Sequence, residues 1–249
     1  MDTLRLPWTA YIPHKPTPKQ LAFLLLENPE ALYGGAAGGG KSDALLMAAL
    51  QYVDQPGYAA LLLRRSYTDL ALPGALMDRA KEWLMPTDAK WYDHRKTWAF
   101  PSGATLTFGY LEHLGDEYRY QSTEFQMIGF DELTQFEETH YRYMFSRLRR
   151  RIGGGAPLRM RSASNPGGIG HEWVRGRFID ADPSDGERVF ISARLPDNPY
   201  LDQDAYVQSL NQLDPVTRRQ LLQGDWTARQ PGNLFQREWF PVVEEAPVF

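Results

Sequence analysis

The fold of this chain is decided by one stretch, Gly34-Gly35-Ala36-Ala37-Gly38-Gly39-Gly40-Lys41-Ser42, which an apolar run over residues 44–50 follows directly. From Gly35 to Ser42 the stretch fits the phosphate-binding pattern of a glycine, four residues, a glycine, a lysine and then serine or threonine. Just upstream, residues 30–33 are half apolar and predict a short strand. Strand, glycine loop and helix in this order are the context that the motif requires, which a flexible glycine linker does not explain.

Each part of this loop has a physical role in holding a triphosphate. Residues without Cβ let consecutive backbone N–H groups turn inward on the phosphates, and a helix that begins near Lys41 adds about half a positive charge at its first turn. We expect Lys41 to neutralise the β- and γ-phosphates of ATP and the Ser42 hydroxyl to bind Mg²⁺. The predicted ATP-binding residues of the loop are Gly35, Ala36, Ala37, Gly38, Gly39, Gly40, Lys41 and Ser42.

The composition is ordinary for a soluble globular protein. The chain has 249 residues, of which 43% are hydrophobic and 23% charged, enough for one large α/β domain or two small ones. Its apolar runs are all shorter than the ~18 residues of a membrane-spanning helix. Residues 1–5 lack the pattern of a secretory signal, and the absence of cysteine suits a reducing cytosol. The net charge of −4 argues against a generally basic nucleic-acid-binding surface but leaves a local basic patch open.

A second decisive stretch, residues 125–132, is a mostly apolar run that ends in two adjacent carboxylates. Asp131, at the tip of the predicted strand, is suited to hold Mg²⁺, and Glu132 to polarise a water for in-line attack on the γ-phosphate. An Asp-Glu pair after apolar residues is often only a solvated strand end. Its position about 90 residues after the phosphate loop makes the pair more specific. That separation leaves room for an intervening strand, as in P-loop ATPases that carry a catalytic glutamate.

The rest of the chain alternates between predicted helices and strands. We expect helices over residues 21–26, 44–52, 68–84 (interrupted at Pro73-Gly74), 140–151, 171–179, 200–213 and 215–222. Strands are expected over residues 58–63, 158–166 and 189–191, with a hairpin over 98–110. The predicted fold class is therefore α/β, a P-loop NTPase of the catalytic-glutamate type with a mainly parallel central sheet flanked by helices. We expect an extended arm over residues 1–16, an ATPase domain over 17–226 and an irregular segment over 227–249.

Several polar residues allow both a functional and a structural interpretation. Gln20, ahead of the phosphate loop, is able to pair with N6 and N7 of adenine, or is an ordinary residue at a helix start. Ser164-Asn165, at the end of a predicted strand, either senses the γ-phosphate and transmits its loss or forms a turn, since Asn-Pro-Gly-Gly also suits one. His171 is interpreted as a packing or capping residue, because no second metal ligand stands at usable spacing.

Arginines gather in a part of the chain, residues 139–171, that contains no acidic residue. A charge run of this kind is usually a solvated face. Against the acidic background of the whole chain, contact with phosphate, in DNA or in a neighbouring subunit's nucleotide, is an equal alternative. The cluster comprises Arg142, Arg147, Arg149, Arg150, Arg151, Arg159 and Arg161.

The series of motifs resembles the large subunit of tailed-phage terminase, the ATPase that packages DNA into viral procapsids. The motifs that carry the resemblance are Thr17-Pro18-Lys19-Gln20, the loop from Gly35 to Ser42, Leu63-Arg64-Arg65-Ser66, Tyr118-Arg119-Tyr120-Gln121, Gly129-Phe130-Asp131-Glu132, Phe145-Ser146-Arg147-Leu148-Arg149-Arg150, Ser164-Asn165-Pro166-Gly167-Gly168, Gly170-His171-Glu172-Trp173, Asp197-Asn198-Pro199-Tyr200-Leu201 and Gly224-Asp225-Trp226. In this family a catalytic-glutamate ATPase domain precedes an RNase H-like nuclease domain. Since the chain stops shortly after Trp226, the resemblance implies the motor domain alone, without nuclease activity.

The resemblance also implies roles for individual residues. Gln20 is expected to contact adenine, Asp131 the metal together with Ser42, and Glu132 the attacking water. Ser164-Asn165 becomes the coupling motif. The family works as a ring in which an arginine of one subunit reaches the next subunit's nucleotide. Our first choice is Arg119, on a loop before the Asp131 strand, and the rivals for this role or for DNA contact are Arg64, Arg147 and Arg149.

The implied cofactors are ATP and Mg²⁺, and the implied partners are double-stranded DNA, the portal protein and the small terminase subunit. The resemblance implies a homo-oligomeric ring when assembled, with a monomer in isolation as the alternative, acting in the host cytoplasm with no membrane partner. Two other functions are considered. One is a helicase-like or regulatory P-loop ATPase that binds nucleic acid without packaging it. The other is a small-molecule P-loop kinase, which Glu132 and the lack of a recognisable acceptor-binding lid disfavour.

Overall fold

A computed structural model describes residues 7–150, 154–182 and 186–229 and places an 8-stranded sheet at the centre of the chain. The strands lie in the order β3-β4-β5-β2-β6-β7-β1-β8. Their bounds are β1 (Glu30–Gly35), β2 (Ala59–Arg64), β3 (Lys90–Tyr92), β4 (Thr97–Ala99), β5 (Thr105–Tyr110), β6 (Met127–Asp131), β7 (Arg159–Ser164) and β8 (Arg188–Ala193). The six strands β5-β2-β6-β7-β1-β8 pair in parallel, whereas β3-β4 and β4-β5 pair in antiparallel fashion. The predicted α/β class with a mainly parallel sheet is confirmed.

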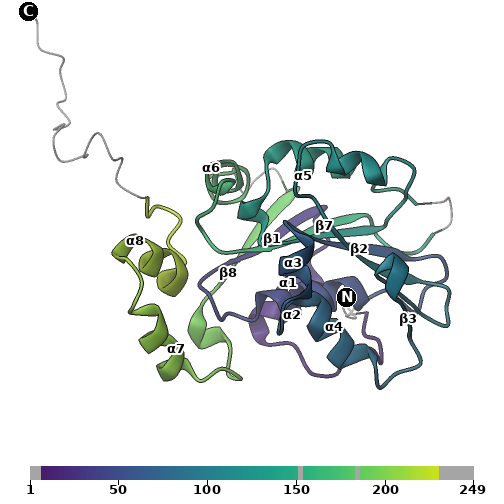
Figure 1. Ribbon diagram of the computed structural model, residues 1–249, viewed down its shortest axis with the longest axis horizontal. Helices are drawn as coiled ribbons and strands as arrows, with labels where there is room; N and C mark the ends of the chain where they lie inside the picture. Colours follow the sequence, from purple (N-terminus) through teal and green to yellow (C-terminus); the bar gives the residue numbers. More distant parts are fainter. Residues whose placement is uncertain (1–6, 151–153, 183–185, 230–249) are drawn as a thin grey trace, which may run out of the picture.

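Helices cover both faces of this sheet (Figure 1). The α-helices are α1 (Pro18–Leu25), α2 (Lys41–Leu50), α3 (Tyr67–Ala71), α4 (Leu76–Leu84), α5 (Glu138–Phe145), α6 (His171–Val174), α7 (Gln203–Leu210) and α8 (Pro215–Arg218). The 3₁₀ turns are η1 (Asp93–Arg95), η2 (Asp116–Tyr120), η3 (Leu133–Gln135) and η6 (Leu195–Asp197), and two π-helical turns, η4 (Arg175–Ile179) and η7 (Arg219–Gln223), continue α6 and α8. Helices α1, α2 and α4 lie on one face, α5 and α6 on the other, and α7 and α8 beside the β8 edge (Figure 1).

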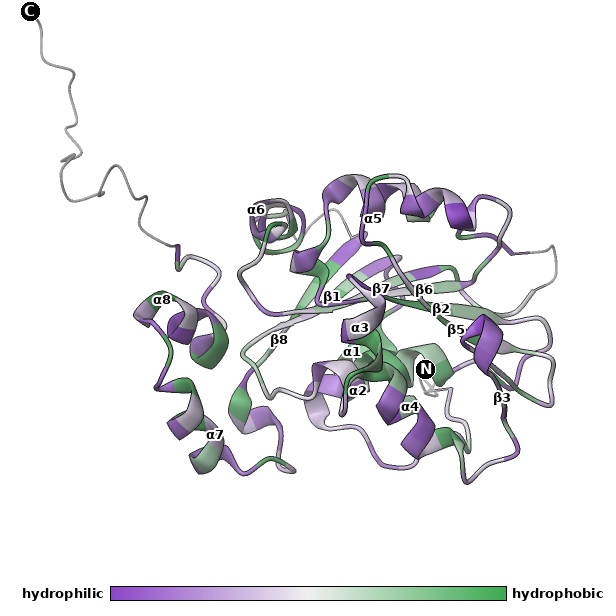
Figure 2. Ribbon diagram, viewed as in Figure 1, coloured by the Kyte–Doolittle hydropathy of each residue, from purple (hydrophilic) through white to green (hydrophobic). Residues whose placement is uncertain are grey.

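The central strand β2 and most of α2 are buried and apolar, whereas the buried strand β7 carries Arg159 and Arg161. In β2 the run Leu61-Leu62-Leu63 is fully buried between β5 and β6, as parallel strands covered on both faces require. Helix α2 is buried from Ala44 to Leu50, since it is wedged against the sheet, α1 and α4. Figure 2 shows hydrophobic colours along the central strands and hydrophilic stretches along α4, α5 and α7. Two separate apolar clusters, one on each face of the sheet, result from this arrangement.

Two residues that make the segment 125–132 less apolar, Gly129 in β6 and Gln126 just before it, have structural reasons. Gly129 lies where α2 crosses the sheet, and a Cβ there would approach Leu62 Cδ2 to 2.5 Å and Leu45 Cδ1 to 3.1 Å. The side chain of Gln126 links two backbones, because its Oε1 accepts from the Ala59 N–H at 2.7 Å and its Nε2 donates to Arg149 O at 2.6 Å. Neither residue weakens the strand.

The helix expected over residues 140–151 is wrong at both ends. Helix α5 runs from Glu138 to Phe145, and the chain then turns to pair with the residue that precedes β6. Phe125 donates to Arg147 O and accepts from the Arg149 N–H, both at 3.0 Å. These hydrogen bonds compete with continuation of the helix, and periodicity in a single segment does not reveal them. Residues 151–153, where the helix was expected to end, lie outside the described residues.

Most other sequence expectations are confirmed within a few residues. The helix over 68–84 is interrupted at Pro73-Gly74 and gives α3 and α4, and the hairpin is formed by β4 and β5. Residues 7–16, the described part of the predicted arm, contain no helix or strand, and Tyr11 and Ile12 are buried, with Tyr11 donating to Asp88 at 2.8 Å. Residues 1–6 of that arm and residues 230–249 of the predicted irregular segment lie outside the described residues. Within the described residues, no helix combines the length and apolar composition needed to cross a membrane.

Candidate functional site

Strand β7 lies between β1, which leads into the glycine loop, and β6, which ends at Asp131. All three strands are parallel, so their carboxyl ends meet at one edge of the sheet. The glycine loop, the carboxylates after β6 and Ser164-Asn165 after β7 therefore converge, at the kind of crevice where open α/β sheets bind ligands. The strand that lies between β1 and β6 in the sheet is β7, which comes later in the chain than both, so the separation of the two motifs along the chain does not account for it.

The loop before α2 has the backbone shape of a phosphate cradle. Gly38 and Gly40 adopt left-handed conformations, with φ of +75° and +71°, and α2 begins directly afterwards at Lys41. The amides of Ala36 and Ala37 are engaged elsewhere, donating to Ala193 O at 2.9 Å and Leu221 O at 2.6 Å. The amides left to face a phosphate are those from Gly38 into the first turn of α2, where N–H groups have no intrahelical acceptor.

Lys41 is buried at the centre of this cradle. Its Nζ donates to Ala36 O at 2.7 Å, so the ammonium lies against a loop carbonyl. Burial lowers the pKa of Lys41, although the nearby carboxylates of Glu132 and Asp131 act in the opposite direction. A buried ammonium is stabilised by an anion beside it, so this position of Lys41 favours an anionic ligand.

Ser42 and Asp131, the two residues predicted to bind the metal, lie in contact with each other. The Ser42 hydroxyl donates to Asp131 Oδ1 at 3.3 Å, and the Asp131 carboxyl group is buried. Two oxygen donors beside a phosphate cradle fit Mg²⁺, which is usually bound by one or two protein oxygens, phosphate and water. The second oxygen of Asp131, Oδ2, accepts a hydrogen bond from Arg64, at the end of the neighbouring strand β2.

Glu132 has an unusual backbone for a residue with a side chain. It adopts a left-handed conformation with φ of +55°, a strain that concentrates at functional sites. Its carboxylate lies 3.5 Å from both the backbone N and the Nδ2 of Asn165. Burial raises the pKa of Glu132, and the adjacent Asp131 raises it further. A carboxylate with a raised pKa is a better proton acceptor near neutral pH than an exposed one.

Gln20 is buried and is bonded at both ends of its amide. The Thr17 N–H donates to Gln20 Oε1 at 2.9 Å, and Gln20 Nε2 donates to Gly40 O at 2.9 Å. The side chain thus ties the start of α1 to the phosphate loop. The adenine contact remains a prediction that would require Gln20 to exchange these partners.

The other predicted arginines lie in different surroundings. Arg119, on η2, pairs with Asp116 at 2.7 Å, rests on the Tyr110 ring and keeps 48% of its side chain exposed. Arg147 is buried and donates to the Gln121 carbonyl, which holds the loop that carries Arg119. Arg149 is exposed, and its Nε donates to Ser146 O at 3.1 Å. The arginine cluster does not form one continuous basic face, because Arg147, Arg159 and Arg161 are buried while Arg142, Arg149 and Arg150 are exposed. Arg151 lies outside the described residues.

Two cavities of about 330 and 440 Å³ adjoin at the phosphate loop and share Gly40, Asp43, Arg79, Asn198 and Leu201. The smaller contains Lys41, Ser42, Glu132 and Asn165. The larger is lined by Gln20 and by the rings of His14, Trp83 and Tyr200. Together they have the size and polarity to hold a nucleotide, with phosphates at the loop and base among the rings.

Sequence reasoning missed Asp43 and Arg79, which form an ion pair of 2.8 Å at the junction of the two cavities. Arg79 comes from α4, and no motif marks it. Asn198 belongs to the Asp197–Leu201 motif, to which the sequence assigned no role. Its Nδ2 donates to Gly38 O at 2.7 Å. His171 is a packing residue as expected, stacked on Trp226.

The chain matches a family model described as terminase large subunit, T4likevirus-type, N-terminal, over residues 32–242. Its fold is similar to that of the large terminase of a thermophilic bacteriophage, with a TM-score of 0.70, 14% identity and coverage of 90% of this chain and 57% of that one. For the HK97 bacteriophage large terminase the values are 0.60, 13%, 86% and 51%. For the ATPase domain of the Thermus phage P74-26 large terminase they are 0.58, 13%, 87% and 96%.

The large terminase of the thermophilic bacteriophage has also been solved in complexes with ATP-gamma-S and with ADP. This chain spans little more than half the length of that protein and of the HK97 protein. A search of curated proteins finds no match. The match to the family model extends over most of the sequence and includes the phosphate loop, both carboxylates and the segment after α8. The chain therefore belongs to the family of terminase large subunits of the T4likevirus type and corresponds to their N-terminal domain.

Proposed function

We propose that this chain is the ATP-hydrolysing motor domain of a terminase large subunit and drives translocation of double-stranded DNA into a procapsid. The observation that carries the proposal is the position of Asp131 and Glu132 at the end of β6, one strand away from the phosphate loop and in contact with Ser42 and Asn165. The relative from the thermophilic bacteriophage has been solved with ATP-gamma-S, which supports nucleotide binding by the same fold.

In this proposal the phosphate loop binds the triphosphate through the amides that begin at Gly38. Lys41 exchanges Ala36 O for the β- and γ-phosphates, a better partner for a buried cation. Mg²⁺, held by Ser42 and Asp131, would neutralise charge on the phosphates. Arg64 would then give up its place on Asp131, which leaves a guanidinium beside the γ-phosphate site.

Glu132 acts as the general base. Its carboxylate accepts a proton as a water attacks the γ-phosphorus in line, and Asn165 holds the carboxylate in position. Because Ser164 bonds Thr134 behind Glu132, we infer that Ser164-Asn165 is the element that responds to loss of the γ-phosphate. Glu132 and Ser164-Asn165, which carry these two roles, all lie at the carboxyl-terminal edge of the sheet.

Arg119 is the proposed arginine finger, acting on the nucleotide of a neighbouring subunit in a homo-oligomeric ring. Its exposed guanidinium and rigidly bonded loop support this choice over buried Arg147. Arg64 is suited to act within its own subunit, and Arg149 to contact DNA. Double-stranded DNA, the portal protein and the small terminase subunit are the proposed partners, and the host cytoplasm the proposed location.

The test is ATP hydrolysis by the purified chain, alone and with portal and duplex DNA. We expect slow basal turnover, because an arginine finger supplies about 10³-fold or more in rate, and stimulation by portal with duplex DNA. Stimulation by single strands alone would point to a helicase-like ATPase. Phosphate transfer to a small molecule would point to a kinase. The Glu132→Gln variant must lose hydrolysis under all conditions if the assignment of the base is right.

A further inference from the structure

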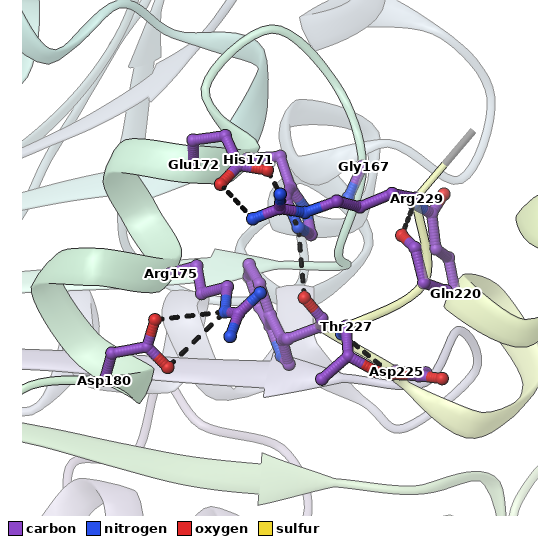
Figure 3. A network of polar contacts seen from close by, with 11 residues as sticks. Gly167, His171, Glu172, Arg175, Asp180, Gln220, Asp225, Thr227 and Arg229 are labelled. Atoms are coloured by element: carbon purple, nitrogen blue, oxygen red, sulfur yellow. Dashed lines mark hydrogen bonds and ion pairs between the residues drawn. The ribbon is translucent and has the colours of Figure 1, made fainter. Parts of the chain in front are cut away.

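His171 joins two parts of the site that are far apart in the sequence. It begins α6, and its ring lies between the turn after β7 and the segment after α8, here residues 224–229 (Figure 3). The Gly167 N–H donates to His171 Nδ1 at 2.9 Å. A ring nitrogen that accepts carries no proton, so the proton is on Nε2, which donates to Trp226 O at 3.2 Å. One neutral imidazole thus bonds both segments at once.

On its upstream side, His171 holds the turn that carries Asn165. This turn is also fixed to the residues that follow Glu132, because the Gly170 N–H donates to Thr134 O at 2.7 Å and Thr134 bonds Ser164. Asn165 in turn lies 3.5 Å from the Glu132 carboxylate. A shift of the Glu132 carboxylate therefore moves a short turn that hydrogen bonds hold on both sides, rather than a free loop.

On its downstream side, His171 holds Trp226, whose side chain is 5% exposed. The two rings stack with centroids 5.5 Å apart and planes 24° apart, and the Trp226 ring also packs edge-on against Phe190 of β8. Residues 224–229 are thereby fastened to the body of the domain. A backbone bond and a buried stack make this fastening stronger than the exposed ion pair between Glu172 and Arg229 nearby (Figure 3).

The phosphate loop is contacted by Leu221 of η7 and by Gly224, the first residue of this segment. Leu221 O accepts from the Ala37 N–H at 2.6 Å. Gly224 has φ of +66°, and a Cβ there would approach Ala36 N to 2.6 Å. The region from η7 to Trp226 therefore contacts both walls of the nucleotide site, the loop before α2 and, through His171, the turn that carries Asn165.

We propose that His171 is a positioning residue that transmits the state of the Glu132–Asn165 contact to residues 224–229. The inference rests on the proposed function, since nucleotide turnover at Glu132 is what changes that contact. Because both hydrogen bonds are made by one rigid ring, the turn after β7 and residues 224–229 move together. Loss of either bond uncouples them without touching any group that contacts nucleotide.

Hydrogen exchange, measured by mass spectrometry on the full chain, tests this directly. In the wild type, ATP-gamma-S with Mg²⁺ is expected to change amide exchange in peptides that cover residues 225–229, which do not contact the phosphate loop directly, by about fivefold, the scale of one hydrogen bond. Three variants separate the acceptor, the donor and the stacking surface of the His171 ring. His171→Asn retains an acceptor near Nδ1, His171→Gln retains a donor near Nε2, and His171→Phe retains the stack alone.

All three variants are expected to bind ATP-gamma-S within about twofold of the wild type but to lose the nucleotide-dependent change in exchange. The matched control is Glu172→Gln, which removes the 2.8 Å ion pair to Arg229 between the same two elements and should keep the full response. If His171→Phe fails to fold, the Asn and Gln variants decide, since each keeps one of the two bonds. A variant that retains the wild-type response overturns the proposal.

The wild-type experiment separates this inference from the proposed function. If ATP-gamma-S binds but exchange over residues 225–229 stays constant, the role of His171 is wrong while the nucleotide site stands. If ATP-gamma-S does not bind at all, the proposed function is wrong, and the inference falls with it.

Discussion

The Ser42 hydroxyl donates to Asp131 Oδ1 at 3.3 Å, although the two residues come from the start of α2 and the end of β6. The contact exists because β7 is inserted between β1 and β6, which brings the two strand ends to the correct separation across the sheet. Side chains on two rigid elements, with Asp131 buried, are held in place before any ligand arrives. This pre-organisation makes the site suitable for phosphoryl chemistry, which depends mainly on positioning and charge.

Replacement of Lys41 by alanine should abolish ATP turnover, because Lys41 is the buried cation in the cradle. The measurement is phosphate release at saturating ATP, together with nucleotide affinity. Lys90→Ala, an exposed lysine on β3, serves as the control and should behave like the wild type. Turnover by Lys41→Ala close to that of the control would remove the loop from the mechanism.

Glu132→Gln should bind ATP and hydrolyse it at least ~10²-fold more slowly, the usual effect of losing a general base. The amide keeps the size of the carboxylate and one of the two hydrogen bonds that it accepts from Asn165, but it has no proton affinity in this range. Single-turnover hydrolysis and ATP-gamma-S binding should be compared with those of the wild type. Near-normal turnover would show that another group activates the water.

The same variant should stabilise the protein without nucleotide at neutral pH. Burial raises the folded-state pKa of Glu132 above its ordinary 4.5, so the folded state binds the proton more tightly than the unfolded chain. The wild type therefore loses stability as pH rises from about 4.5 through the folded pKa, and glutamine does not titrate. Urea unfolding at pH 4 and pH 8 should show the advantage of Glu132→Gln growing with pH, and an advantage that shrinks would contradict this sign.

Gly129→Ala should destabilise the fold by about 1–3 kcal/mol, because the added methyl group overpacks the contacts of β6 with Leu62 of β2 and Leu45 of α2. Its Cβ would lie 2.5 Å from Leu62 Cδ2. Gly176→Ala, where a Cβ meets no atom within 4 Å, is the control and should cost little. Urea midpoints measure both, and equal midpoints would mean that β6 tolerates a side chain at this position.

Arg119→Ala should lose hydrolysis stimulated by assembly, because the exposed guanidinium is the proposed finger for a neighbouring subunit. Mixing it with Lys41→Ala tests action between subunits, since each chain supplies what the other lacks at a shared interface. We expect partial recovery of ATPase activity in the mixture over either chain alone. No recovery at any ratio, from chains that fold and assemble, would leave the role across subunits without support.

Local sequence patterns predicted those elements that are determined by residues within the element itself. The glycine loop, the buried strand β2 and the interruption at Pro73-Gly74 follow from backbone freedom, continuous apolarity and the missing proline N–H. The end of α5 did not follow from a local pattern, because the residues after it hydrogen-bond to Phe125, which precedes α5 in the sequence. Arg79 was missed for a similar reason, since only packing of α4 against α2 places it beside Asp43.

By itself, the sequence determined which groups are available for chemistry: a glycine loop with a lysine and a serine, and two adjacent carboxylates after an apolar strand. Short-range constraints on φ, on burial and on residue type are enough for that. Only the tertiary structure decided which partners each of these groups has, with Lys41 on Ala36 O, Arg64 on Asp131 and His171 between Gly167 and Trp226. Such pairings depend on strand order and helix packing, which arise from contacts between residues distant in the chain.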